Sequence, residues 1–216
     1  MRIVYVEDDD YTRITTAALM RECGHEVVAA LPSTAGLRNV LSPGPCDVAV
    51  LDLDLGPGPT GLDVAISVRR IAPRVGILIL STYPDPRLLT DDPVLPPRTS
   101  YVTKRLVRTP ELLDEALNIA ANPADNRSTS DLAAFDPTNV MPTLRRTQVN
   151  LLREVAEGWT NAEIADRQGV GIDAVEKSIQ RLARRLKIPS GNRINSRVLL
   201  AQAYTRICGA PGGGNR

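Results

Sequence analysis

Short apolar runs alternate with longer amphipathic stretches along roughly the first 120 residues of the chain. The apolar runs, which are typical of buried strands, occupy positions 2–6, 26–30, 48–52, 76–81 and 101–103. The stretches between them repeat apolar residues at helical spacing, and the helices they predict are Tyr11–Cys23, Ser33–Leu41, Gly61–Ile71 and Pro110–Ala121. This alternation predicts an α/β domain in which helices cover both faces of a parallel sheet.

The predicted sheet is doubly wound and flavodoxin-like, with its five strands in the order 2-1-3-4-5. One interval departs from the pattern. The segment Tyr83–Arg98 contains five prolines, at positions 84, 86, 93, 96 and 97. Because an interior proline costs a helix about 3 kcal/mol, we expect the helix between the fourth and fifth strands to be reduced to a turn or lost.

Acidic residues stand where the first and third strands end. Glu7 and Asp8 follow the run at 2–6, and Asp52 ends the run at 48–52. Ligands of open α/β sheets bind at the carboxyl ends of the strands, so these carboxylates are expected to meet in one crevice. Carboxylates held close together repel unless a cation or a proton neutralises them, and oxygen ligands suit Mg²⁺. The sequence therefore predicts a small acidic Mg²⁺ site.

Two donors complete this set of strand-end residues. Ser81 follows the run Ile77–Leu80, and Lys104 follows Tyr101–Thr103. A hydroxyl and an ammonium group beside a carboxylate-bound metal could bind the oxygens of a phosphoryl group carried by Asp52.

The order and spacing of these residues resemble the receiver domain of bacterial two-component response regulators over about residues 1–120. The resemblance implies that Asp52 accepts a phosphoryl group from a sensor histidine kinase. It also implies that Glu7 or Asp8, together with Asp52 and the backbone carbonyl of Asp54, holds Mg²⁺.

The same resemblance assigns roles to three residues near the ends of the fourth and fifth strands. Ser81 and Lys104 match the pair that senses the phosphoryl group, and Tyr101 matches the aromatic residue that turns inward upon activation.

Charge separates the two halves of the chain. Residues 1–144 contain 13 Lys and Arg against 19 Asp and Glu, a net charge of −6, whereas residues 145–206 contain 12 against 6, a net charge of +6. Because neutralising phosphates dominates nonspecific affinity for nucleic acid, the basic half is predicted to bind it.

The basic half predicts a small helical domain. Its expected helices are Leu144–Gly158, Asn161–Gln168, Ile172–Leu186 and Ile194–Ile207. Thr160 and Glu163 form a capping box at the second helix. The third has an apolar stripe and an opposite face of basic and amide side chains, which suit phosphates and major-groove base edges.

The stretch EVAEGWTNAEIADRQGVGIDAVEKSIQRLARRLKI resembles the helix-turn-helix of the NarL/LuxR family of transcription regulators, with the likeness running from about Leu144 to Arg206. The resemblance implies double-stranded DNA as a partner and a homodimer paired through the last helix. The recognition-helix contacts it implies fall on Glu176, Lys177, Gln180, Arg181 and Arg184.

The sequence as a whole predicts a receiver domain at 1–121, a linker at 122–142, a helix-turn-helix domain at 143–208 and a tail at 209–216. No apolar run is long enough for a membrane span, so we expect a cytoplasmic protein. The expected function is regulation of transcription in a phosphorelay, with no conventional enzymatic activity.

Two alternatives remain open. One is a Mg²⁺-dependent phosphatase or phosphotransferase with Asp52 as nucleophile and Asp54 as general acid. The other is a DNA-binding regulator that is independent of phosphorylation and uses the acidic pocket only as structure.

Overall fold

The computed structural model describes residues 1–41, 46–90, 93, 95–122, 144–189 and 195–208. The chain forms two compact units. The first comprises Met1–Thr82 and Pro93–Asp136, and the second comprises Tyr83–Asp92 and Pro137–Arg216. The structure therefore assigns Tyr83–Asp92 to the second unit, although the sequence places this segment inside the first domain. The predicted tail, and the predicted linker beyond Asn122, lie outside the described residues.

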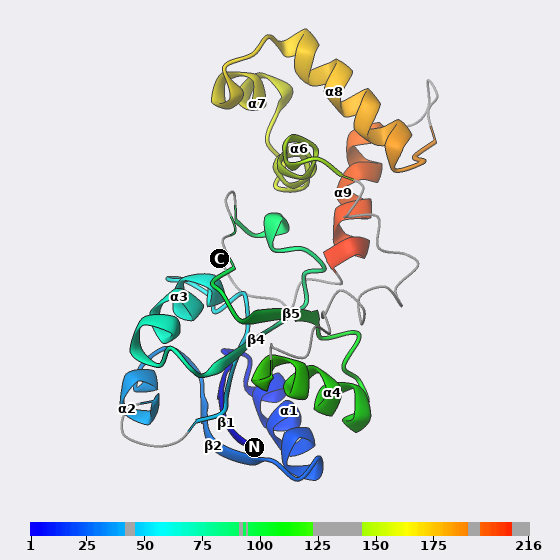
Figure 1. Ribbon diagram of the computed structural model, residues 1–216. Helices are drawn as coiled ribbons and strands as arrows, with labels where there is room; N and C mark the ends of the chain where they lie inside the picture. The colour runs from blue at the N-terminus through cyan, green and yellow to red at the C-terminus, as the bar shows by residue number, and fades with distance from the viewer. Residues whose placement is uncertain (42–45, 91–92, 94, 123–143, 190–194, 209–216) are drawn as a thin grey trace. The chain divides into compact units, whose positions relative to one another are not determined.

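The first unit is built on a sheet of five parallel strands (Figure 1). The strand order β2-β1-β3-β4-β5 confirms the predicted topology. The strands are β1 (Arg2–Val6), β2 (Glu26–Leu31), β3 (Val48–Leu51), β4 (Gly76–Ser81) and β5 (Thr99–Thr103).

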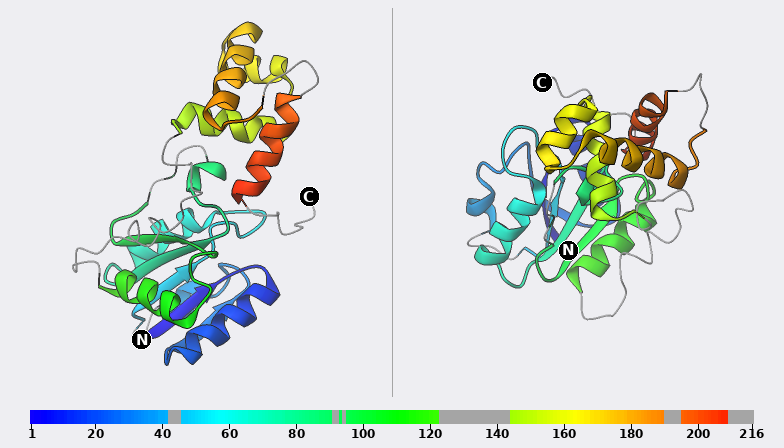
Figure 2. Two further views of the ribbon diagram at one scale, coloured as in Figure 1. Left: turned by 90° about the vertical axis from the view of Figure 1, so that its right-hand side faces the viewer. Right: turned by 90° about the horizontal axis from the view of Figure 1, so that it is seen from above.

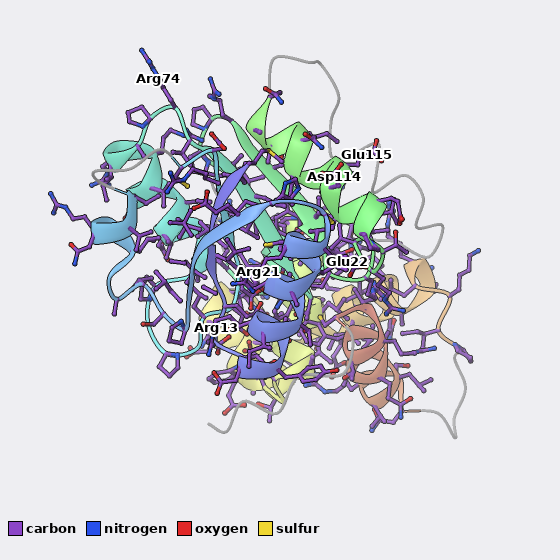
Figure 3. All side chains as sticks on the ribbon, turned by 90° about the horizontal axis from the view of Figure 1, so that it is seen from below. Arg13, Arg21, Glu22, Arg74, Asp114 and Glu115 are labelled. Atoms are coloured by element: carbon purple, nitrogen blue, oxygen red, sulfur yellow. The ribbon has the colours of Figure 1, made fainter. Side chains whose placement is uncertain are left out.

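Helices cover both faces of this sheet, as the alternating pattern predicts (Figure 1). Helices α1 (Asp10–Glu22) and α4 (Pro110–Ala121) pack together on one face, and α2 (Leu37–Leu41) and α3 (Gly61–Ile71) on the other. Figure 3 shows Arg21 and Glu22 on α1 and Asp114 and Glu115 on α4. The core beneath α1 and α4 includes Ile3, Tyr5, Val50, Leu78, Met20 and Leu117. Burial on both faces explains why the central strands β1, β3 and β4 are nearly uniformly apolar.

The predicted start of the second helix was wrong. Helix α2 begins at Leu37, not at Ser33. Ahead of it, the backbone N–H of Ala35 donates to Ser33 Oγ at 3.3 Å, and Gly36 is left-handed with a φ of 81°. Serine side chains that bind nearby backbone groups favour turns over helix, and a left-handed residue cannot continue a right-handed helix.

The prediction that the fourth helix is reduced to a turn or lost is confirmed over the part of this interval that the structure describes. Between β4 and β5 the described residues form only a single 3-10 turn, η1 (Pro86–Leu88). Asp85 caps this turn by accepting the backbone N–H of Arg87 at 2.9 Å. The prolines exclude a longer helix because each removes a backbone donor and clashes with the preceding turn.

The second unit contains α6 (Arg146–Ala156), α7 (Asn161–Gln168), α8 (Ile172–Arg185) and α9 (Ser196–Cys208), shown from two further sides in Figure 2. The predicted capping box is present at α7, where Thr160 and Glu163 exchange hydrogen bonds. Gly169, with a φ of 63°, then ends α7 in the left-handed conformation that glycine favours. Among the helices that the structure describes, none has the length and hydropathy of a membrane span.

One glycine fixes the distance between α3 and the end of β3. A Cβ atom added at Gly61 would lie 1.9 Å from the backbone oxygen of Asp52. We expect Gly61→Ala to push the loop away from Asp52 and to destabilise the first unit by about 1–3 kcal/mol, the usual cost of overpacking. Faster amide hydrogen exchange in peptides of β3 would measure this.

The matched control is Gly171→Ala, because a Cβ atom there would meet nothing within 4 Å and the φ of −75° suits alanine. Wild-type exchange in both variants would show that the close approach at Gly61 does not constrain the fold.

Candidate functional site

Three carboxylates meet at the carboxyl edge of the sheet. The backbone N–H of Asp52 donates to the Val6 carbonyl at 2.9 Å, which holds the end of β3 beside the residues that follow β1. One oxygen from each of Glu7, Asp8 and Asp52 lies within 4.8 Å of the other two. Glu7 and Asp52 are buried, at 1% and 5% exposure, whereas Asp8 is exposed. The structure thus brings the three predicted acids into one cluster.

Lys104 joins this cluster from the end of β5. Its Nζ lies 2.6 Å from Glu7 Oε2 and 3.2 Å from Asp52 Oδ2. Its backbone N–H donates to the Ser81 carbonyl at 2.7 Å, and Ser81, which ends β4, is fully buried. The predicted hydroxyl and ammonium groups therefore follow adjacent strands at the same edge as the acids. Their proposed role in sensing a phosphoryl group stays a prediction.

Tyr5 is a component of the site that the sequence analysis missed. Its hydroxyl donates to Glu7 Oε2 at 2.8 Å, so this one oxygen accepts from both Tyr5 and Lys104. Burial and the neighbouring Glu7 carboxylate raise the pKa of Tyr5 well above its ordinary value, which keeps the hydroxyl protonated as a donor. The apolar strand pattern hid it, although residues two apart on a strand share a face, and this spacing is the signal that could have found it.

Arg13 is the second residue missed, and it reaches the site from α1, where Figure 3 labels it. Its guanidinium donates to the backbone carbonyl of Glu7 at 2.9 Å and forms an ion pair with Asp10. These contacts hold the segment that carries Glu7 and Asp8 against the first turn of α1.

The acid cluster fits a divalent metal ion. Mg²⁺ prefers oxygen ligands, uses few protein carboxylates and keeps several waters. Glu7, Asp8 and Asp52 provide such a set, and Asp8 is open to solvent on one side. The metal would compete with Lys104 for the Glu7 and Asp52 oxygens. Participation of the Asp54 carbonyl stays a prediction; its side chain accepts the Gly56 N–H at 3.3 Å.

Tyr101 lies on β5, opposite Ile79 of β4, and is half-buried. Tyr101 stands two residues before Thr103, which pairs with Ser81 at the end of β4, so Tyr101 lies near the carboxyl edge of the sheet. The proposed inward turn of Tyr101 upon activation stays a prediction.

The five predicted DNA-contacting side chains all stand on the exposed face of α8. The opposite face is buried through Val175, Ile179 and Leu182. Arg181 Nε donates to the Lys177 carbonyl at 3.2 Å, which holds this guanidinium along the helix surface. The exposed residues are Glu176, Lys177, Gln180, Arg181 and Arg184.

No protein-family model matches the chain. Two of the curated proteins similar to it illustrate the likeness. The oxygen regulatory protein NreC of Staphylococcus haemolyticus is 23% identical over 214 residues, covering 88% of this chain and 93% of NreC. The DNA-binding transcriptional activator DevR/DosR of Mycobacterium tuberculosis is 30% identical over 150 residues, covering 65% of this chain and 66% of DevR/DosR.

Among solved structures, RcsB of Salmonella enterica serovar Typhimurium, bound to the rprA promoter in the presence of the phosphomimetic BeF₃⁻, aligns with 95% of this chain and 98% of its own. The TM-score is 0.53 and the identity 18%, so this likeness concerns the fold. The chain belongs to the two-component response regulators. A receiver domain and a NarL/LuxR-type helix-turn-helix account for both units of this regulator.

The protonation of Asp52 follows from its burial. Burial raises the pKa of Asp52 to about 7, although the Lys104 ammonium group opposes the shift. Burial disfavours the ammonium form of Lys104, yet the Asp52 and Glu7 carboxylates outweigh it and raise the pKa of Lys104. Near neutral pH and without a metal, Lys104 is therefore charged while Asp52 is divided between its acid and its carboxylate.

This shift predicts a pH dependence of stability. Between the ordinary aspartate pKa of about 4 and the folded value of about 7, the folded regulator holds more protons on Asp52 than the unfolded chain does. The stabilisation of the first unit is therefore lost as the pH rises through this range. Hydrogen exchange of β3 amides, corrected for intrinsic rates and measured with EDTA, should show the loss in the wild type and a smaller one in Asp52→Asn.

Asp54→Asn is the control, since it removes a nearby carboxylate of the same kind and should keep the wild-type dependence. Equal dependence in Asp52→Asn and the wild type would place the titrating group elsewhere.

Proposed function

We propose that this response regulator controls transcription by accepting a phosphoryl group on Asp52 and binding DNA through α8. The observation that carries the proposal is the buried Asp52 carboxylate, which lies beside two further acids and the Lys104 ammonium group at the carboxyl edge of the sheet. Its partners would be a sensor histidine kinase and double-stranded DNA. Because it would act on DNA, we expect the protein in the cytoplasm.

In the proposed transfer, an oxygen of the Asp52 carboxylate attacks the phosphorus of a phosphohistidine on the kinase. The new O–P bond forms as the P–N bond breaks, and the ring nitrogen leaves with its electron pair. Glu7, Asp8 and Asp52 would hold Mg²⁺, which supplies positive charge to offset that of the phosphoryl oxygens. Lys104, whose Nζ lies 3.2 Å from Asp52 Oδ2, contributes a second positive charge.

Phosphorylation would change the partner of Lys104. In the unphosphorylated site its ammonium group lies closer to Glu7 than to Asp52. A phosphoryl group on Asp52 presents more negative charge, so Lys104 would turn to it and the Ser81 hydroxyl would be drawn to a phosphoryl oxygen. The receiver would then shift between two states, with Tyr101 turning inward.

DNA binding would use the exposed face of α8. Lys177 and Arg181 offer charge to phosphates and donors to base edges, Glu176 and Gln180 offer polar groups on the same face, and Arg184 lies one turn further on. Helix α9 would pair two copies, since Val198 on this helix is 51% exposed. A symmetric dimer fits the two half-sites that helix-turn-helix proteins commonly bind.

The first test concerns the phosphoacceptor. Asp52→Asn should abolish labelling by acetyl phosphate and Mg²⁺, because an amide cannot act as the attacking carboxylate. Intact-mass measurement after treatment would detect the added phosphoryl group in the wild type alone.

Asp54→Asn is the matched control and should still be labelled. Persistent labelling of folded Asp52→Asn would remove Asp52 from its role, whereas an unlabelled wild type would favour a regulator that works without phosphorylation. Release of phosphate from small phosphoesters that depends on Asp54 would favour the phosphatase alternative.

The second test concerns DNA, with a binding site selected by the wild-type protein from random sequences. Lys177→Ala and Arg181→Ala should each weaken binding by about 1–3 kcal/mol if the side chain reads a base, and should reduce the salt dependence if it contacts phosphate. Fluorescence anisotropy over a salt series measures both quantities.

Arg21→Ala removes an equal charge from the exposed surface of α1 and should leave affinity and salt dependence unchanged. Wild-type behaviour of both α8 variants would move the DNA contact to another surface.

A further inference from the structure

The segment between β4 and β5 is built into the core of the second unit. Leu88, in the turn η1, is fully buried. It belongs to the same apolar cluster as Val149 and Leu152 of α6 and Leu200 of α9, and Tyr83 packs against that cluster. Burying a leucine side chain completely stabilises the core that surrounds it. The segment that replaces the fourth receiver helix is therefore a structural part of the DNA-binding unit.

Polar contacts fix this segment in addition to its apolar packing. The Tyr204 hydroxyl of α9 donates to the Leu88 carbonyl at 3.2 Å. The Arg87 guanidinium donates to the Leu144 carbonyl, just before α6, at 3.0 Å. Asp85 holds that guanidinium through two hydrogen bonds, of 2.9 and 2.6 Å. The turn is thus attached to the start of α6 and to the C-terminal half of α9.

The other end of the segment is tied to the phosphoacceptor site by the chain itself. Ser81 is the last residue of β4, and Thr82 alone separates it from Tyr83. One extended residue spans only about 3.3–3.6 Å, so the connection has little slack. Pro84 and Pro86 reduce the slack further because their φ angles are fixed.

We propose that the segment Tyr83–Leu88 transmits the state of the phosphoacceptor site to α6 and α9. The inference rests on the proposed function, in which Ser81 moves toward a phosphoryl oxygen. A shift of Ser81 would pull Tyr83 and Leu88 and so change how they pack against α6 and α9. Since α9 also carries the exposed Val198, the expected output is a change in dimer pairing and hence in DNA affinity.

The test uses the full-length protein with Leu88→Ala and a matched control. Leu95→Ala makes the same substitution later in the same connection, where the side chain is 42% exposed. Without phosphorylation, Leu88→Ala should speed amide hydrogen exchange in α6 and α9 at least about tenfold, because it leaves a cavity in their core, and Leu95→Ala should not.

The coupling is then measured as the ratio of DNA affinities with and without acetyl phosphate. Leu88→Ala should lose most of the wild-type ratio while Asp52 is still labelled, and Leu95→Ala should keep both ratio and labelling. Tyr204→Phe removes the hydrogen bond to Leu88, together with the hydroxyl's contact to Cys208, and should reduce the ratio at least twofold. It decides the question if Leu88→Ala does not fold.

The outcomes separate the two proposals. If labelled Leu88→Ala keeps the wild-type ratio of DNA affinities, the inference is overturned and the phosphorylation of Asp52 stands. If Leu88→Ala does not fold, the same result in labelled Tyr204→Phe overturns the inference. A wild-type protein that acetyl phosphate and the kinase fail to label would overturn the proposed function, and the coupling inference with it. Unchanged exchange in α6 and α9 of folded Leu88→Ala would overturn the docking on which the inference depends.

Discussion

The balance of charge around Asp52 is the constraint on which the rest of the first unit depends. Three acids lie together at one edge of the sheet, two of them buried, and the Lys104 ammonium group lies within 4 Å of both the Glu7 and the Asp52 carboxylate. Burial outweighs the attraction of Lys104 and raises the pKa of Asp52 to about 7, so near neutral pH its acid and carboxylate forms are in balance. A site in such balance responds strongly to any added charge, whether it is a metal ion or a phosphoryl group.

Precise backbone positions make this balance possible. Gly61 lets α3 start directly against the Asp52 carbonyl, and Arg13 ties the carbonyl of Glu7 to α1. Tyr5 donates to Glu7 from within the core, so Glu7 keeps a hydrogen-bond partner when Lys104 leaves it. The helices and strands therefore do more than support the site: they hold its acids at separations that free side chains would not keep.

The segment that stands in place of the fourth receiver helix connects the Asp52 site with the second unit through the chain itself. Prolines prevent the segment after β4 from covering the sheet as a helix, so its apolar side chains need another place to be buried. Leu88 is buried among α6 and α9 instead. In this chain the residues after β4 lead directly into the core of the second unit. This connection is shorter than the linker predicted at 122–142.

The sequence was sufficient to predict the alternation of strands and helices, the sheet order and the meeting of Glu7, Asp8 and Asp52, because parallel strands bring their carboxyl ends to one edge. It also determined the exposed face of α8, through the spacing of Val175, Ile179 and Leu182. Tertiary structure alone decided that Tyr5 bonds Glu7, that Leu88 belongs to the second unit, and that Asp52 titrates near neutrality. Periodicity along a chain reveals which side of an element is buried. The groups that this side contacts, and how completely they exclude solvent, depend on residues far away in the sequence.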